Sequence, residues 1–280
     1  MLAFSTKICY FRKTFVVPLN LKTMPELPDV EIFRQYAESN ALNRRIEKVT
    51  VDEPKISEAD EQVLNTALKD QQFTSAERIG KYLFLPTTPD NILVMHFGMT
   101  GWLEYNRGEK PRHARASFHF SDEYALHFIN PRKLGRISLT DSQEVFTKEK
   151  KVGYDALAIT PENFQDLIRK NKGTLKSFLM NQGTIAGIGN IYSDEILFQA
   201  GMNPKKSISD LEEYHYMALY QSMKEVLHKA IEHNADPENM PASFIIPRRK
   251  EGDKCPACGS EVKKDKISGR GFYYCPHCQQ

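Results

Sequence analysis

The sequence predicts an α+β fold in three parts: an N-terminal antiparallel β-sandwich with flanking helices, a helical middle part and a C-terminal zinc-ribbon hairpin. Three observations lead to this prediction. Short segments rich in β-branched and aromatic residues fill residues 45–139. Helical apolar periodicity begins near Pro161. Two C-x-x-C pairs lie close to the end of the chain.

The first part begins with a helix expected over Asp29–Leu42, because Val30, Phe33 and Ala37 place apolar side chains on one helix face. After this helix the spacing of the apolar residues shortens, and Gly, Pro, Asp and Asn separate the apolar runs. This pattern indicates the strands of an antiparallel sandwich. A short helix over Glu58–Lys69 is expected to interrupt them. The expected strands are Ile46–Val51, Phe73–Ile79, Tyr82–Leu85, Ile92–Phe97, Ala116–Phe120, Tyr124–Phe128 and Arg136–Leu139.

The middle part is expected to be helical. Gly201 suits the residue that ends a helix, and a polar stretch over Asn234–Lys254 leads from the last helix to the cysteines. The expected helices are Pro161–Asn171, Thr174–Asn181, Ile191–Ala200 and Ser209–Asn234.

The last part carries Cys255, Cys258, Cys275 and Cys278 with the spacing C-x2-C-x16-C-x2-C. Such pairs bring four thiolates to one zinc ion, and a closed shell of four thiolates leaves no position for a substrate. The sequence therefore predicts one structural Zn²⁺ whose binding supplies the folding energy of this small segment. His277 is expected to be exposed rather than a ligand.

A hairpin is expected between the two cysteine pairs, with Ser268–Gly271 at its turn. Arg270 beside glycines can bring a guanidinium close to a phosphate. On this segment alone, an ordinary exposed arginine in a tight turn is the simpler interpretation.

A glycine-rich connection precedes the helix expected at Ile191. Gly187 and Gly189 permit a tight turn, and Asn190 suits the N-cap. Free backbone N–H groups and the helix dipole would make an anion site there, and glycines would let a phosphate approach. A plain helix–helix connection is the alternative.

Composition excludes some classes of protein. The 280 residues are 40% hydrophobic and 26% charged, as in ordinary globular proteins, and no apolar run is long enough to span a membrane. Residues 1–23 hold four of the 38 basic side chains and no acid, so the rest has 34 basic and 36 acidic residues. Net charge therefore does not argue for a nucleic-acid partner.

Residues 1–23 form an N-terminal extension with two interpretations. A misassigned start codon upstream of Met24 is preferred, which suits a bacterial cytoplasmic protein. An organellar presequence is the alternative, because the segment is basic, lacks acids and contains hydroxyl residues.

Three segments together resemble the formamidopyrimidine-DNA glycosylase and endonuclease VIII family. They are MPELPDVE at Met24–Glu31, AGIGNIYSDE at Ala186–Glu195, and GRGFYYCPHCQ at Gly269–Gln279. The resemblance covers residues 24–280. It implies an N-terminal β-sandwich catalytic domain at 24–140, a helix–two-turn–helix DNA-binding domain at 155–240 and a zinc finger at 248–280.

The resemblance also implies a bifunctional DNA glycosylase and abasic (AP) lyase of base excision repair. Removal of the initiator Met24 would expose the amine of Pro25 as the nucleophile, and a terminal amine is partly unprotonated at neutral pH. Glu26 matches the catalytic carboxylate, and Lys81 matches a lysine that contacts DNA phosphate. Without the resemblance, Pro25 would be interpreted as a helix-entry proline and Lys81 as a surface lysine.

The remaining residues that the resemblance selects would bind DNA around a flipped nucleotide. Asn190 and Arg270 match the phosphate contacts. Met99 and Arg132 match two of the residues that fill the gap left by the flipped base. The loop that carries Arg132, NPRKLG at Asn130–Gly135, also departs from the family. Leu134 and Lys133 stand where the family has an aromatic residue and a second arginine, so wedging and opposite-base preference should differ.

The stretch Asn234–Lys254 departs from the family as well, because it does not match the longer glycine-rich loop of members that excise 8-oxoguanine. The lesion therefore stays open among oxidised pyrimidines, formamidopyrimidines, hydantoins and abasic sites. The expected partner is double-stranded DNA with such a lesion, with no membrane, no cofactor besides zinc, and a monomeric protein.

Two rival functions stay open on the sequence alone. If residues 1–23 are retained, Pro25 is an amide and the protein is a non-catalytic damaged-DNA-binding protein. The second rival function is RNA binding or assembly through the zinc ribbon, and this function leaves Pro25 and Glu26 unexplained.

Overall fold

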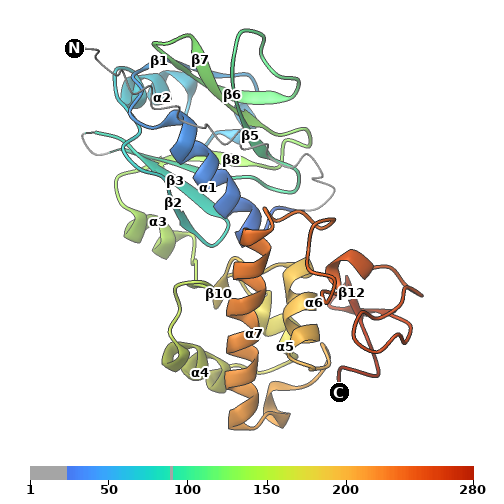
Figure 1. The fold of residues 1–280 in the computed structure, drawn as a ribbon. Coiled ribbons are helices and arrows are strands. Elements are labelled where there is room, and N and C mark those ends of the chain that lie inside the picture. The colour runs from blue at the N-terminus through green and yellow to red at the C-terminus, as the bar shows by residue number, and fades with distance from the viewer. Residues whose placement is uncertain (1–23, 89–90) are drawn as a thin grey trace, which may run out of the picture.

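The computed structural model describes residues 24–88 and 91–280, so the predictions for residues 1–23 lie outside the described residues. A β module lies above a helical module, and the C-terminal hairpin packs on one side of the helical module (Figure 1). The predicted α+β fold with three parts is confirmed. No helix in these ranges is long and apolar enough to cross a membrane.

The β module is a sandwich of two four-stranded antiparallel sheets. The apolar core between them also takes in the inner face of α1 (Leu27–Ala41), which begins two residues before the predicted start. Pro28 fits the first turn of that helix because this turn does not use its N–H. The strands of one sheet follow the order β1 (Ile46–Val51), β6 (Ala114–Phe120), β7 (Tyr124–Ile129) and β5 (Trp102–Arg107). Those of the other sheet follow the order β2 (Glu77–Ile79), β3 (Tyr82–Pro86), β4 (Ile92–His96) and β8 (Arg136–Thr140).

Several predicted elements differ from the observed ones. Strand β5 is missing from the sequence-based prediction because Glu104 and Asn106 hide its alternation, although Leu103 is buried. The predicted strand from Phe73 shrinks to β2. The predicted helix Glu58–Lys69 is found as the shorter α2 (Glu61–Leu68). The short helix η1 (Pro54–Ile56) before it and α3 (Gln143–Glu149) are additional.

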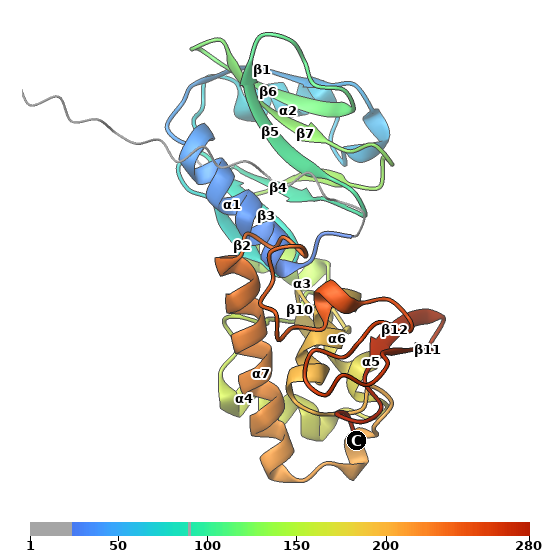
Figure 2. The ribbon, with the colours of Figure 1, turned by 45° about the vertical axis from the view of Figure 1, so that its right-hand side comes forward.

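The helical module has its own apolar core. Its longest helix, α7, runs along the side of the module and reaches α1 at the upper end (Figure 2). The elements are α4 (Pro161–Lys170), α5 (Leu175–Leu179), α6 (Asn190–Gln199), η2 (Ile208–Asp210), α7 (Glu213–Glu232) and η3 (Ile246–Arg248), and the hairpin is formed by β11 (Lys263–Ile267) and β12 (Arg270–Tyr274).

The two modules meet at the start of α1. Leu27 donates its backbone N–H to the carbonyl oxygen of Gly187 at 2.9 Å, and its side chain belongs to the core of the helical module. Nearby, β9 (Tyr154–Asp155) pairs in parallel with β10 (Ile185–Ala186). The carboxylate of Asp155 binds the guanidinium of Arg78 from β2, so a buried ion pair joins the modules next to the site described below.

Candidate functional site

A pocket of about 430 Å³ lies at the junction of the two modules and the hairpin. It brings together five of the residues selected from the sequence, whereas Arg132, Lys133 and Leu134 do not line it. The lining residues are Met24, Glu26, Lys81, Met99, Met180, Gln182, Ile188, Gly189, Asn190, Ile191, Arg249, Arg270 and Gly271.

Glu26 lies at the N-terminus of α6 and is only 3% exposed. Its carboxylate accepts hydrogen bonds from the backbone N–H groups of Gly189 (2.6 Å), Ile191 (2.8 Å) and Tyr192 (3.3 Å). The N-terminal end of a helix stabilises an anion in this way. The anion site predicted for a DNA phosphate at these backbone groups is therefore wrong, because the protein's own carboxylate occupies it.

Pro25 precedes this carboxylate and is buried. In the described chain its nitrogen forms the peptide bond to Met24, whose side chain is 42% exposed and contributes to the pocket wall. Pro25 itself is not among the lining residues. Its nitrogen can therefore react only in a chain from which Met24 has been removed.

Lys81 and Gly80 form the tight turn between β2 and β3. Gly80 has φ +58°, and a side chain there would lie 2.7 Å from Cβ of Ala186, so only glycine lets the turn dock on the helical module. The Gly80 N–H donates to Asp155 at 2.7 Å, which fixes the turn. Lys81 is 8% exposed, and burial lowers its pKa, while the carboxylates of Glu26 and Asp29 oppose that shift.

Asp29, the expected first residue of the N-terminal helix, lies close to Glu26 but was not selected as a site residue from the sequence. Its carboxylate accepts the backbone N–H of Glu26 at 2.8 Å. Burial raises the pKa of Asp29 to about 7, an effect that the negative charge of Glu26 reinforces. Only its position one helical turn after Pro25 could have drawn attention to it in the sequence.

Asn190 is the first residue of α6, and Gly189 occupies the N-cap, so the predicted N-cap role of Asn190 is wrong. The Asn190 amide instead donates from Nδ2 to the carbonyl oxygen of Gly271 at 2.9 Å. Its Oδ1 is buried and has no hydrogen-bond partner among the described residues. The side chain thus joins α6 to β12.

Arg270 lies at the tip of the hairpin and is exposed. The turn consists of Ser268 and Gly269 alone, both with positive φ, as in the two-residue turns that suit twisted hairpins. Arg270 is therefore the first residue of β12 rather than part of the turn. Its side chain contributes to the lining of the pocket.

Met99 lies in a turn that packs against the loop 130–135. Asn130, which is fully buried, links the two: its Nδ2 donates to the carbonyl oxygen of Phe97 at 2.9 Å, and its Oδ1 accepts the N–H of Leu134 at 2.9 Å. A side chain at Gly98 would lie 2.5 Å from the backbone of Leu134. Sequence reasoning passed over Asn130, although it begins the segment NPRKLG.

The loop itself presents three exposed side chains outside the pocket. Leu134 is 46% exposed. Lys133 forms an ion pair with Glu53, and this pairing lowers the pKa of the Glu53 carboxyl. Arg132 has no hydrogen bond or ion pair with any described residue, so its guanidinium is available to a ligand.

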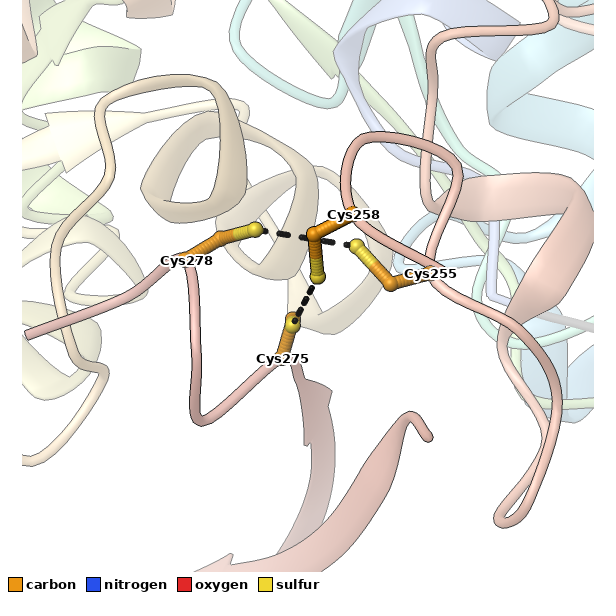
Figure 3. A group of neighbouring side chains, drawn as sticks. All are labelled: Cys255, Cys258, Cys275 and Cys278. Atoms are coloured by element: carbon orange, nitrogen blue, oxygen red, sulfur yellow. Dashed lines mark hydrogen bonds between the residues drawn. The ribbon is translucent and has the colours of Figure 1, made fainter. Parts of the chain in front are cut away.

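Cys255, Cys258, Cys275 and Cys278 converge at the base of the hairpin (Figure 3). All four sulfur atoms lie within 4.8 Å of one another, and two pairs are 3.5 and 3.8 Å apart. A tetrahedral zinc ion with Zn–S bonds of about 2.3 Å requires sulfur–sulfur distances of about 3.8 Å. The thiolates therefore fit one structural Zn²⁺, as predicted.

Comparisons with known proteins agree with this geometry. Three family models match: the formamidopyrimidine-DNA glycosylase N-terminal domain at residues 24–137, the formamidopyrimidine-DNA glycosylase H2TH domain at 153–240, and the zinc finger found in FPG and IleRS at 252–280.

Whole-chain relatives extend the match. The formamidopyrimidine-DNA glycosylase of Pelotomaculum thermopropionicum is 33% identical over 92% of this chain and 99% of its own length, and that of Mycoplasma genitalium is 31% identical over 92% and 96%. Two solved structures of the Lactococcus lactis protein also match. Its complex with DNA containing N7-benzyl-Fapy-dG has a TM-score of 0.83 at 28% identity, and its complex with abasic-site DNA has 0.82 at 29%, over 91% of this chain and 99–100% of theirs. The chain therefore belongs to the formamidopyrimidine-DNA glycosylase family of enzymes.

Proposed function

We propose that this chain is a bifunctional DNA glycosylase and abasic lyase that acts on double-stranded DNA with a damaged base or an abasic site. The observation that carries the proposal is the pairing of Pro25 with Glu26, whose carboxylate is fixed at the α6 N-terminus and borders the pocket. A nucleophilic amine and an adjacent carboxylate are the groups that Schiff-base chemistry at a sugar carbon needs.

The proposed reaction begins once Pro25 is the first residue. Its lone pair attacks C1′ of the nucleotide, the bond from C1′ to the base breaks, and the base leaves with that electron pair and is protonated by solvent. The attached nitrogen gives up its proton to Asp29, the Glu26 carboxylate relays that proton to the ring oxygen, and the bond from C1′ to the ring oxygen breaks to give the iminium link. Loss of a proton from C2′ with departure of the 3′ phosphate completes the β elimination, and loss of a proton from C4′ with departure of the 5′ phosphate completes the δ elimination.

Asp29 fits the role of proton acceptor for the amine. Its carboxyl is one helical turn after Pro25, and its pKa of about 7 lets it take up and release a proton near neutral pH. The backbone N–H of Glu26 fixes its orientation. We infer that Asp29 accepts the proton that Pro25 loses when it attacks.

Three side chains suit the phosphates on either side of the flipped nucleotide. Lys81 of the β module and Arg270 of the hairpin supply positive charge to the pocket, and Asn190 of α6 adds an amide to its lining. Lys81 has no hydrogen bond or ion pair with a described residue, so its ammonium keeps all three donors for a ligand.

We propose that Met99, Arg132 and Leu134 fill the gap that the flipped base leaves, with Lys133 beside them. The link through Asn130 supports a wedge made by both loops together. Leucine has no aromatic face, so this wedge should stack on neighbouring bases more weakly than an aromatic residue would.

The solved Lactococcus lactis relatives hold DNA with N7-benzyl-Fapy-dG, an abasic site or an oxidised pyrimidine. These three kinds of lesion agree with the set that the sequence leaves open. We therefore propose formamidopyrimidines, oxidised pyrimidines and abasic sites as the substrates to be tested first. The proposed domains span residues 24–140, 155–240 and 248–280.

A second function follows if residues 1–23 are retained. Pro25 would then stay an amide, and the protein would bind damaged DNA without covalent chemistry. The burial of Pro25 behind a partly exposed Met24 favours testing this directly.

Borohydride trapping on a duplex with one abasic site tests the proposal. Two versions of the chain are compared, one beginning at Met1 and one at Met24, with intact mass showing whether Pro25 is the first residue. We expect a covalent band from the processed Met24 version alone, with peptide mapping that places the adduct on residue 25. A folded, zinc-containing protein with Pro25 exposed and no band would exclude the lyase and favour the binding protein.

A further inference from the structure

A buried cluster of charged groups links the helical module, the linker (Asn234–Lys254, between α7 and the cysteines) and the hairpin. Asp194 of α6 is fully buried, and its Oδ1 lies 2.5 Å from Nζ of Lys176, which is 1% exposed. Its Oδ2 accepts hydrogen bonds from Arg249 in the linker, at 3.1 Å from Nε and 2.7 Å from the terminal nitrogen. The proposed reaction uses none of these three groups.

The same carboxylate holds strand β12. The backbone N–H of Tyr273 donates to Oδ2 of Asp194 at 3.0 Å. Lys176 lies over the ring of Phe272 at 5.9 Å, and Arg249 lies over the ring of Tyr273 at 5.1 Å. Because neighbouring side chains on a strand point to opposite faces, the two cations lie against both faces of β12.

The two cations also hold the start of α6. The backbone oxygen of Asn190 accepts from Nζ of Lys176 at 3.2 Å and from Arg249 at 3.4 Å. The Asn190 side chain in turn donates to Gly271 of β12 at 2.9 Å. Asn190 and the strand that begins with Arg270 are therefore bound to one cluster.

Stability alone is a weak explanation for this arrangement. Desolvation of buried charges offsets much of their attraction, and apolar residues of similar volume often stabilise a protein equally well. Two cations that share one carboxylate do, however, allow only one relative placement of the three segments that they join. Fixed geometry is the property that such a cluster supplies.

We propose that Asp194 is a positioning residue that sets the distance between Asn190 and Arg270, so that both meet adjacent phosphates of the same DNA strand. The inference rests on the proposed DNA-binding function of those two residues. Asp194 does not touch the DNA itself, and it acts through β12 and through the backbone of Asn190.

The test compares DNA binding at a range of salt concentrations, with the zinc-containing full chain and a duplex that carries a stable abasic-site analogue. Each phosphate contact contributes about 0.9 to the slope of log affinity against log salt. We expect Asp194→Asn to weaken binding about tenfold and to reduce the slope by about one, as Arg270→Ala does. In the double variant, we expect no further reduction.

Glu195→Gln is the matched control. Glu195 is the next residue of α6 and is equally buried, but its carboxylate accepts from the backbone of Ile245 and Ile246 and from the side chain of Gln199, and it makes no hydrogen bond to β12 among the described residues. This variant should keep the slope of the parent even where it lowers the melting temperature. If Asp194→Asn does not fold, Arg249→Met, which leaves the Lys176 ion pair intact, is measured in the same way.

The outcomes separate the two proposals. An unchanged slope in Arg270→Ala argues against the phosphate contact and hence against the proposed function. A reduced slope in Arg270→Ala with an unchanged slope in Asp194→Asn, or fully additive losses in the double variant, overturns the positioning role. A reduced slope in Glu195→Gln also overturns it, because any buried carboxylate of α6 would then have the same effect.

Discussion

Gly189→Ala tests whether the contact between Glu26 and the α6 N-terminus is essential. A methyl group on residue 189 would lie 2.4 Å from Cδ and 2.5 Å from Oε1 of Glu26, far inside contact distance. Gly189 has φ −125°, which alanine also adopts, so the substitution introduces a steric conflict without backbone strain. The carboxylate must therefore move by about 1 Å and leave its backbone donors.

The size of the effect follows from the bonds that are lost. The two shortest bonds of Glu26, at 2.6 and 2.8 Å, join an anion to a helix terminus, and each such bond contributes about 1.5–3 kcal/mol. We expect a loss of about 3 kcal/mol in the free energy of unfolding and a melting temperature about 6–12 °C lower. Displacement of the carboxylate should slow borohydride trapping about 100-fold.

Gly183→Ala is the control for Gly189→Ala. It lies in the same connection, and a methyl group there would be 3.4 Å from its nearest neighbours, an ordinary contact. It should leave both the melting temperature and the trapping rate close to those of the parent protein. A Gly189→Ala protein that traps DNA at the parental rate would refute the argument that this carboxylate must occupy the helix terminus.

Three further predictions concern zinc, pH and the wedge. Removal of Zn²⁺ by a chelator should weaken binding to abasic-site DNA about 100-fold, because the hairpin that carries Arg270 and Gly271 loses its support. Added Zn²⁺ should restore the binding, and the circular dichroism signal of the two modules should stay constant throughout. Burial raises the pKa of Glu195 from 4.5 to about 7, so its folded form holds a proton more tightly than the unfolded form, and stability falls as pH rises between these values. Urea unfolding should show that the parent loses about 2–3 kcal/mol more than Glu195→Gln between pH 5 and pH 8, and equal losses would contradict that pKa. Leu134→Phe should bind abasic-site DNA about tenfold more tightly through base stacking, whereas Leu134→Met, which cannot stack in this way, should resemble the parent.

The sequence was most informative where structure depends on local spacing. Two C-x-x-C turns bring four thiolates together whatever the rest of the chain does, so the zinc site could be predicted without knowledge of the fold. The long apolar stripes of α1 and α4 likewise determined helices, although their ends differ by one or two residues. The tight turn at Ser268 and Gly269 was predicted two residues too long, because Gly271 has the composition of a turn but pairs in the hairpin.

The sequence was least informative where contacts join distant segments. Glu26 and Gly189 are 163 positions apart, and nothing in either segment states that they meet. The same holds for Asn130 and Phe97, whose bond joins the loops that carry Leu134 and Met99 across 33 positions. Strand β5 was missed for a related reason, since its polar side chains are only partly buried and its place in the sheet comes from pairing with β7.

The glycine-rich start of α6 shows how a correct physical argument can select the wrong ligand. Free N–H groups, a helix dipole and glycines do form an anion site there, as the sequence indicated. The anion is Glu26, because α1 begins at the module junction and delivers that carboxylate to the helix terminus. Under the proposed function, a DNA phosphate therefore needs donors other than these backbone groups. Side-chain donors among the lining residues are Asn190 on α6, Arg270 on β12 and Lys81 of the β module. In the proposed function, the helix terminus thus fixes the carboxylate that relays protons, while the cations of Arg270 and Lys81 are left to bind the DNA strand.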